Sequence, residues 1–240
     1  MIDMHSHIIP NVDDGSKSLK ETLEMIKEAK DVGFTSIFLT SHYLTHYYEP
    51  SVEELIKRKE KIQKALKEKD IELELYTGME VYVSDSIREL ISQNKLLELN
   101  NSRYMLIELP INANINYFDS VVYYLQSVSI IPILAHPERY TYVQKNPSLI
   151  QEYIDNGVLI QSNYGSILGL YGKSTKKVIK GMLKNNQVHF LGSDSHKPNT
   201  IYPLIPKAIK KIKKIIGEEM TEQITILNPT KIIENNEFSF

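Results

Sequence analysis

Two histidines stand two positions apart near the start of the chain, in the stretch MIDMHSH, where apolar and polar residues alternate. Alternation of this kind predicts a β-strand, and side chains two residues apart in a strand point to the same face. His5 and His7 would therefore present two imidazole rings to one metal ion. A solvated strand face would alternate in the same way, so this stretch by itself leaves both interpretations open.

Histidines and carboxylates of the same kind end several later apolar runs. One run ends in TSH and another in AHPER, where Arg139 follows the histidine closely; a third ends in SDSH. Two adjacent aspartates, Asp13 and Asp14, precede a glycine, and the residues alone do not separate them as donors. The candidate metal donors are His5, His7, one of this aspartate pair, His42, Glu80, Glu108, His136, Asp194 and His196.

This donor set predicts a metal site with more than one ion. Imidazole and carboxylate without thiolate suit manganese, iron(II) or zinc, and the chain has no cysteine. Nine donors are too many for one ion and suit two or three, with a carboxylate bridging neighbours about 3.5–4 Å apart. Three divalent ions would outweigh four carboxylates and a hydroxide, which leaves a positive site beside Arg139. A phosphate ester fits such a site, so we expect metal-assisted phosphoester hydrolysis.

The elements that must position these side chains alternate between strands and helices. Between the strands, Ser18 with Glu21 and Ser51 with Glu54 form capping boxes that begin helices, and Asn146 is expected to cap another. Seven β-rich runs are predicted at residues 1–7, 35–42, 73–81, 104–110, 131–139, 158–165 and 188–196. Such alternation predicts an α/β fold with a parallel sheet, here a closed or nearly closed seven-stranded (β/α) barrel formed by one domain, residues 1–240. In barrels of this kind the chemistry lies at the carboxyl ends of the strands.

Composition excludes several other classes of protein. The chain of 240 residues has a net charge of −2, so no global basic field indicates nucleic acid as a partner. The lack of cysteine excludes disulfides and a cysteine nucleophile. The start of the sequence has no basic region followed by an apolar stretch, and no apolar run is long enough to span a bilayer. We therefore expect a cytoplasmic protein.

A lysine-rich segment at residues 206–219 reads PKAIKKIKKIIGEE. Its isoleucines recur at helical spacing, so the lysines fall mainly on the opposite side of a helix. A solvated face is the ordinary interpretation. The alternative is a docking strip for an acidic tail or for inner-leaflet lipid.

The order of the motifs DMHSH, TSH, GME, IEL, AHPER and SDSH resembles the PHP (polymerase and histidinol phosphatase) superfamily. The stretches HSHIIPNVDDG, NSRYMLIELP and AHPERY are similar, more narrowly, to the PHP-type tyrosine-protein phosphatases of capsular and exopolysaccharide operons of Gram-positive bacteria. The resemblance extends from Met1 to about Pro229.

This resemblance implies a distorted seven-stranded barrel with up to three metal ions, most often manganese. It also implies Asp14 rather than Asp13 as the ligand, and Arg139 as the residue that holds substrate phosphate. A hydroxide held by the metals would attack phosphorus directly, without a covalent intermediate, and release a tyrosine phenolate. The implied partner is an autophosphorylating tyrosine kinase that controls polysaccharide export.

One departure from the family pattern concerns substrate binding. Members often have a second arginine a few residues after the motif that here reads SDSH, whereas this chain has Lys197 nearby and no arginine. Lysine is a point charge and does not reproduce the planar fork of arginine, so either phosphate affinity is lower or Lys197 takes part of that role. We count Lys197 with Arg139 among the expected substrate-binding residues. Two alternatives therefore stay open: a small-molecule phosphatase, for example one acting on histidinol phosphate, and a metal-binding regulatory module without catalysis.

Overall fold

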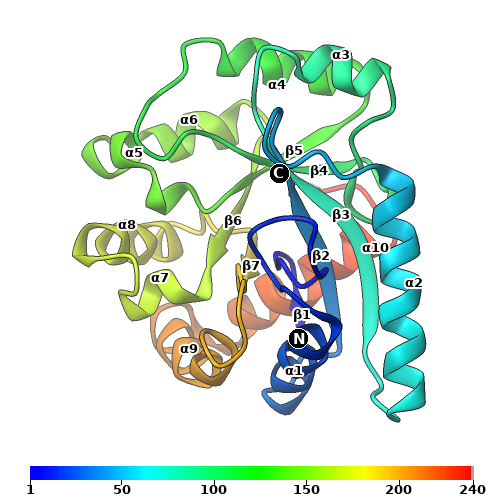
Figure 1. Ribbon diagram of the computed structural model, residues 1–240. Coiled ribbons are helices and arrows are strands. Elements are labelled where there is room, and N and C mark those ends of the chain that lie inside the picture. Colours follow the sequence, from blue (N-terminus) through cyan, green and yellow to red (C-terminus); the bar gives the residue numbers. More distant parts are fainter. Residues whose placement is uncertain (239–240) are drawn as a thin grey trace.

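The computed structural model describes residues 1–238, in which seven parallel strands are joined in chain order into one sheet (Figure 1). Hydrogen bonds also join the two ends of the sheet: Asp194 N donates to His5 O (2.8 Å), and His7 N donates to Ser195 O (2.9 Å). The result is a nearly closed barrel, which confirms the predicted fold class. The strands are β1 (Ile2–Asp3), β2 (Ser36–Tyr43), β3 (Glu74–Tyr82), β4 (Tyr104–Glu108), β5 (Ile131–Ala135), β6 (Leu159–Asn163) and β7 (Phe190–Gly192).

Helices connect the strands and surround the sheet in Figure 1. The α-helices are α1 (Leu19–Asp31), α2 (Val52–Glu68), α3 (Ile87–Ser92), α4 (Phe118–Ser127), α5 (Thr141–Lys145), α6 (Leu149–Asp155), α7 (Tyr164–Leu168), α8 (Lys173–Lys184), α9 (Ile205–Glu222) and α10 (Asn228–Ile233). Shorter helical turns are η1 (Leu99–Asn101), η2 (Pro137–Arg139), η3 (Tyr202–Leu204) and η4 (Gln223–Leu227). α9 is interrupted at Gly217, which has a φ of 81°. Within residues 1–238, none of these helices combines the length and the hydropathy that crossing a membrane requires.

Two of the three predicted helix starts are confirmed. The side chain of Ser18 accepts a hydrogen bond from Glu21 N (3.2 Å), and that of Ser51 accepts one from Glu54 N (3.1 Å). The prediction that Asn146 caps a helix is wrong. Asn146 instead ends α5, and Ser148 stands at the start of α6, where its hydroxyl donates to Asn146 Oδ1 (2.8 Å).

Side chains of the strands alternate between the surrounding helices and the barrel interior. In β2, Ile37 and Leu39 belong to the large core shared with the helices, whereas Phe38 belongs to a separate apolar cluster. The same alternation runs through the other long strands. The second cluster lies inside the barrel, towards the amino-terminal ends of the strands. It comprises Ile2, Met4, Phe38, Leu99, Tyr104, Leu106, Ile133, Ala135, Leu159, Phe190 and Ile232. Its members come mainly from the first halves of the strands, so the carboxyl ends are free to carry polar side chains.

Candidate metal centre

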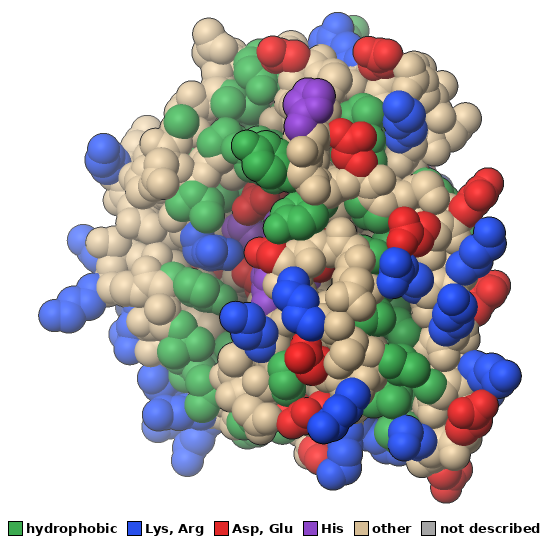
Figure 2. Space-filling view, in the orientation of Figure 1, with side chains coloured by type: hydrophobic (Ala, Val, Ile, Leu, Met, Phe, Trp, Pro, Cys, Tyr) green, Lys and Arg blue, Asp and Glu red, His purple; other side chains and the backbone are tan. Residues whose placement is uncertain are grey.

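The interior positions change from apolar to polar at the carboxyl ends of the strands. Two residues beyond Leu106 in β4 stands Glu108, and His42 and Glu80 stand near the carboxyl ends of β2 and β3 in the same alternating register. The remaining candidates follow β1, β5 and β7. The structure therefore brings all nine expected donors to one mouth, and Figure 2 shows histidine and carboxylate side chains in a hollow near the centre of this face. Their potential ligand atoms form three overlapping groups, each within 4.8 Å: His5, His7 and Glu80; His42, Glu80 and Glu108; and His7, Asp14, His42 and His196.

Glu80 belongs to two of these three groups and contacts four histidines. Its Oε2 lies 3.2 Å from His5 Nε2, 3.3 Å from His7 Nε2 and 3.0 Å from His42 Nδ1. Its Oε1 lies 3.0 Å from His136 Nε2. The side chain is only 1% exposed, so water cannot take the place of these partners. A carboxylate with both oxygens directed at several donor groups is placed as a bridging ligand would be.

His136 is the fifth histidine of this cluster, at the point where β5 ends. Its backbone has a φ of 35°, a left-handed conformation that is uncommon for residues other than glycine. This conformation turns the chain from the strand into η2. Its Nε2 consequently faces Glu80 and lies 3.7 Å from Glu108 Oε1.

His5 and His7 lie beyond β1, because the strand ends at Asp3 and does not extend over residues 1–7 as predicted, yet both rings enter the mouth with a hydrogen-bond partner behind them. His5 Nδ1 lies 2.9 Å from Gln161 Oε1, and His7 Nδ1 lies 2.9 Å from Asp13 Oδ2. Both partner oxygens accept, so each Nδ1 carries the hydrogen and each Nε2 of a neutral ring presents its lone pair. These two Nε2 atoms lie 3.0 Å apart and point at each other. Two lone pairs at this distance repel unless a proton or a metal ion lies between them.

The charges around the mouth lead to the same conclusion. Burial by itself would lower the pKa of His5, but the carboxylates of Glu80 and Asp194 outweigh burial and raise that pKa to about 9. In the same way Glu80 raises the pKa of His42 to about 10 against the effect of burial. Burial together with the negative charge of Glu80 raises the pKa of Glu108 to about 7. The cluster therefore has an excess of negative charge, and the residues present fit a site for divalent cations.

The structure separates the roles of the two adjacent aspartates. Asp13 is buried and binds behind the ring of His7, and it also accepts hydrogen bonds from Gly15 N (2.9 Å) and His42 N (3.0 Å). Asp14 points into the mouth, where its Oδ1 lies 3.3 Å from His196 Nε2 and 3.7 Å from His42 Nε2. A hydrogen bond from His196 lowers the pKa of Asp14 to about 2. Asp14 thus faces the other candidate donors, whereas Asp13 lies behind the ring of His7 and orients it.

Gly15 is needed for this arrangement. A Cβ atom at this position would lie 2.1 Å from the backbone oxygen of His7 and 2.6 Å from its Cβ. Any side chain would therefore push the loop that carries the two aspartates away from His7.

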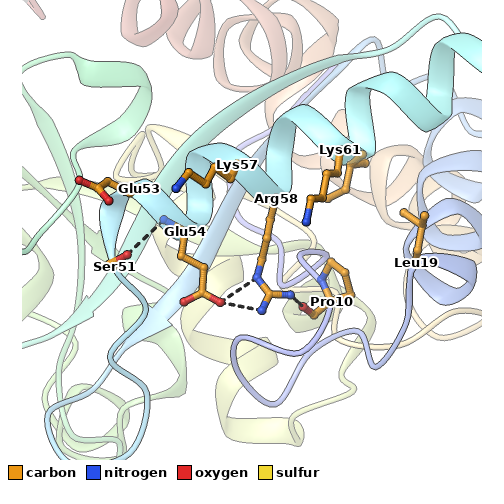
Figure 3. Close-up of a pocket in the computed structure, with 9 residues that line it drawn as sticks. Pro10, Leu19, Ser51, Glu53, Glu54, Lys57, Arg58 and Lys61 are labelled. Carbon is orange, nitrogen blue, oxygen red and sulfur yellow. Dashed lines mark hydrogen bonds and ion pairs between the residues drawn. The ribbon is translucent and has the colours of Figure 1, made fainter.

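Arg58 of α2 supports the same loop from the outside. Its guanidinium donates to Pro10 O (2.7 Å) and to Glu54 Oε1 (Figure 3). These residues lie at the edge of a pocket of about 410 Å³.

The sixth strand supplies residues that the sequence analysis did not identify. Gln161 accepts from His5 and donates to Asn163 Oδ1 (2.9 Å), and Asn163 Nδ2 donates to Asp194 Oδ2 (2.7 Å). This chain of hydrogen bonds connects two expected ligands through β6. The signal in the sequence was a pair of amide side chains, two residues apart, in the same apolar-led run that ends at the mouth.

Asp194 and Arg139 form an ion pair at the mouth. Arg139 Nη1 lies 2.8 Å from Asp194 Oδ2, and the guanidinium carbon lies 4.6 Å from the centre of the Tyr171 ring. The other oxygen of Asp194 lies 3.7 Å from His5 Nε2 and 3.5 Å from His7 Nε2. Arg139 therefore stands beside the metal donors, as expected for a residue that binds substrate phosphate. Tyr171, which supports the guanidinium, was not identified from the sequence.

Glu138 and Lys197 each follow a candidate histidine, but only Glu138 is tied into the hydrogen bonds around the mouth. Glu138 is completely buried and accepts hydrogen bonds from Asn163 N (2.9 Å) and Ser166 Oγ (2.6 Å), so it attaches η2, and with it Arg139, to β6 and α7. Lys197 is exposed, and its side chain makes no hydrogen bond or ion pair with any residue in the described range 1–238. The structure thus does not bring Lys197 into the network that holds the other expected residues.

The fold and the mouth together define the chain as a (β/α) barrel with a candidate centre for several metal ions. More specifically, the chain belongs to the family described as "Capsular polysaccharide synthesis, CpsB/CapC", whose model matches residues 1–234. This membership confirms the family resemblance that the sequence motifs indicated.

Relatives with established names agree with this family. The chain is 37% identical over 196 residues to the putative tyrosine-protein phosphatase CapC of Staphylococcus aureus, covering 82% of this chain and 77% of the relative. It is 31% identical over 225 residues to the tyrosine-protein phosphatase YwqE of Bacillus subtilis, covering 94% and 89%.

Solved structures match the whole barrel. One match comes from crystal structures described as YwqE from Bacillus subtilis and CpsB from Streptococcus pneumoniae, "unique metal-dependent tyrosine phosphatases". It has a TM-score of 0.92 at 28% identity, and the alignment covers 100% of this chain and 96% of the matched chain. The histidinol phosphate phosphatase of Lactococcus lactis has a TM-score of 0.61 at 15% identity, with 89% and 93% covered. This second likeness shows a shared fold.

Proposed function

We propose that this chain is a metal-dependent protein-tyrosine phosphatase. Relatives that are named tyrosine phosphatases align with nearly its whole length, and the donors at the barrel mouth fit divalent cations beside an arginine. The observation that carries the proposal is the pair of Nε2 atoms of His5 and His7, which face each other 3.0 Å apart beside the buried Glu80. On the far side of the rings, Gln161 holds Nδ1 of His5 and Asp13 holds Nδ1 of His7. These hydrogen bonds direct both Nε2 atoms to the same point in the mouth.

The proposed metal ligands are the nine residues expected from the sequence. Seven of them make up the three overlapping groups, and His136 and Asp194 adjoin these groups through their contacts with Glu80, His5 and His7. Two or three ions fit these groups, and the imidazole and carboxylate donors suit manganese, with iron(II) and zinc as alternatives. The ligands are His5, His7, Asp14, His42, Glu80, Glu108, His136, Asp194 and His196. Bound ions would supply charge neutralisation and an activated water for hydrolysis without a covalent intermediate.

The chain's own residues bind and orient the substrate. Arg139 presents its guanidinium at the mouth and would hold two non-bridging phosphate oxygens through its planar fork. Asp194 and Tyr171 fix the direction of that fork before substrate arrives. The leaving group is a tyrosine phenolate, whose conjugate acid has a pKa of about 10, so departure needs less assistance than an alkoxide would. Lys197 lies outside the hydrogen-bonded network and would add only an exposed positive charge near the mouth.

The proposed physiological setting is the cytoplasm, where the substrate is a phosphotyrosine-containing protein. Family membership supports a tyrosine kinase of capsule or exopolysaccharide synthesis as that protein. We propose that residues 1–240 form a single catalytic domain, and a sheet that includes segments from both halves of the chain supports this.

The experiment is a paired assay of phosphate release from a phosphotyrosine peptide and from histidinol phosphate, with manganese added. We expect the peptide to be the better substrate, and we expect chelation or His136→Ala to abolish its turnover. Preference for histidinol phosphate would replace the proposal with a small-molecule phosphatase. Metal binding without turnover of either substrate would indicate a regulatory module.

A further inference from the structure

Positive charge is concentrated on two neighbouring helices, α8 and α9. Residues 173–184 and 205–216 contain ten lysines and no aspartate or glutamate, although the whole chain has a net charge of −2. The edge of the molecule over these helices has blue side chains and no red ones in Figure 2. The lysines are Lys173, Lys176, Lys177, Lys180 and Lys184 on α8, and Lys207, Lys210, Lys211, Lys213 and Lys214 on α9.

Seven of these lysines form one surface, which we call the lysine face. The five lysines of α8 line a shallow groove together with Gly181. From α9, Lys207 and Lys211 adjoin them: desolvation and the like charges of Lys176, Lys207 and Lys180 lower the pKa of Lys211. None of the seven has a carboxylate partner among residues 1–238, whereas Lys213, on another side of α9, pairs with Glu218. The lysine face consists of Lys173, Lys176, Lys177, Lys180, Lys184, Lys207 and Lys211.

The lysine face begins at the barrel mouth. Tyr171, two residues before α8, lies under the guanidinium of Arg139, so Lys173 starts the row close to the proposed phosphate-binding arginine. From there the row follows α8 for about 16 Å at 1.5 Å per residue. An extended peptide rises about 3.3 Å per residue, so about five residues would cover this length. Alternate residues of such a peptide repeat every 6–7 Å, close to the pitch of about 5.4 Å at which lysines recur along the helix.

A peptide suits this surface better than a lipid bilayer does. Helices that bind a membrane surface combine basic residues with exposed apolar side chains that enter the bilayer. Within the described part of α8 and α9, no large apolar side chain is exposed; Leu170, just before α8, is the nearest. Binding to a bilayer would therefore be stabilised only by the attraction between these lysines and anionic lipids.

We propose that the lysine face docks an acidic, extended segment next to the phosphotyrosine of the protein substrate. The proposal rests on the phosphatase function proposed above and adds the chemical class of the sequence around the target tyrosine. Opposite charges along the face hold the segment, while the phosphate lies at the mouth beside Arg139. The interaction lowers KM for such a substrate and is weakened by salt, since the charges are exposed.

The test compares two phosphotyrosine peptides that differ only in their flanks, alternating Glu and Ser in one and Gln and Ser in the other. The variant Lys176→Glu/Lys180→Glu/Lys211→Glu reverses three charges of the lysine face. Lys57→Glu/Lys61→Glu/Lys64→Glu on α2 is the matched control, with the same change of net charge on a distant helix (Figure 1). The small substrate p-nitrophenyl phosphate reports on the mouth alone, and circular dichroism checks folding of both variants.

At low ionic strength the unaltered protein and the control should prefer the acidic peptide about tenfold in KM, and the lysine-face variant should lose this preference. Turnover of p-nitrophenyl phosphate should be the same in all three, and the preference should fade at about 0.5 M salt. An equal KM for both peptides in the unaltered protein, with normal turnover of p-nitrophenyl phosphate, would overturn the docking proposal and leave the phosphatase intact.

A binding assay separates this failure from a failure of the phosphatase function. Fluorescence anisotropy with the unphosphorylated acidic peptide needs no catalysis, so binding that depends on the lysine face would support docking even in a protein that hydrolyses neither substrate. Absence of peptide binding combined with lysine-dependent sedimentation on vesicles of anionic lipid would overturn the proposal in favour of a membrane surface.

Discussion

Replacing Asp13 by asparagine is expected to weaken metal binding about 10- to 100-fold while the barrel stays folded. Asp13 accepts three hydrogen bonds, from His7 Nδ1 (2.9 Å), Gly15 N (2.9 Å) and His42 N (3.0 Å). Asparagine offers one accepting oxygen and one NH2 group, so at least one of these donors would face another donor. The substitution also removes the negative charge that lies behind the ring of His7 and fixes its orientation.

The predicted loss corresponds to about 1.4–2.7 kcal/mol of binding free energy. Titration calorimetry of the metal-free protein with manganese measures it directly and does not depend on turnover. Asp31→Asn on α1 is the matched control, because it makes the same chemical change at an exposed carboxylate. The control should bind manganese like the unaltered protein.

Asp14→Asn makes this test specific. Asp14 points into the mouth as a proposed ligand, so its replacement should cost at least as much affinity as the replacement of Asp13. If Asp13→Asn bound manganese as tightly as the unaltered protein, the argument that Asp13 orients His7 would be refuted. A larger loss for Asp13→Asn than for Asp14→Asn would show that the two roles are assigned wrongly.

Three further predictions concern other parts of the molecule. Arg139→Lys keeps the charge but loses the planar fork, so KM for a phosphotyrosine peptide should rise about tenfold at unchanged manganese affinity; an unaltered KM would contradict a role in phosphate binding. Gly192→Ala should lower both thermal stability and manganese affinity, since its Cβ would lie 2.5 Å from that of His5, and a variant that matches the parent in both would contradict it. Burial lowers the pKa of His189 to about 4, below its unfolded value of about 6.5, so its contribution to stability is complete above pH 6.5 and is lost as pH falls towards 4. Urea unfolding against pH should show this loss, of up to about 3 kcal/mol, and His189→Gln should reduce it; an equal loss in the variant would contradict the assignment.

The positions of the strands could be predicted because each is a short apolar run followed by polar residues. β2, for example, is apolar up to the TSH motif, and the change in polarity marks where the chain leaves the barrel. The caps at Ser18 and Ser51 were equally accessible, because a capping box depends on residues only three apart. At Asn146 the same reasoning was wrong, because the residue closes the preceding helix instead.

Supporting residues were harder to predict than ligands. Gln161 and Asn163 have no charge and no motif, and their importance comes from lying between His5 and Asp194, which are 189 positions apart in the chain. Tyr171 likewise becomes relevant only because the fold places its ring under Arg139. These contacts are long-range, so no local pattern reveals them.

The sequence by itself determined the barrel class, the identity of the candidate donors and the end of the strand at which each one stands, since hydrophobic alternation and residue chemistry are local properties. Only the tertiary structure decided that Asp13 supports His7 while Asp14 faces the mouth. It also decided that Glu80 lies between four histidines and that the lysines of two helices form one face. Each of these depends on distances between segments far apart in the chain, and such distances are set by closure of the barrel and by packing around it.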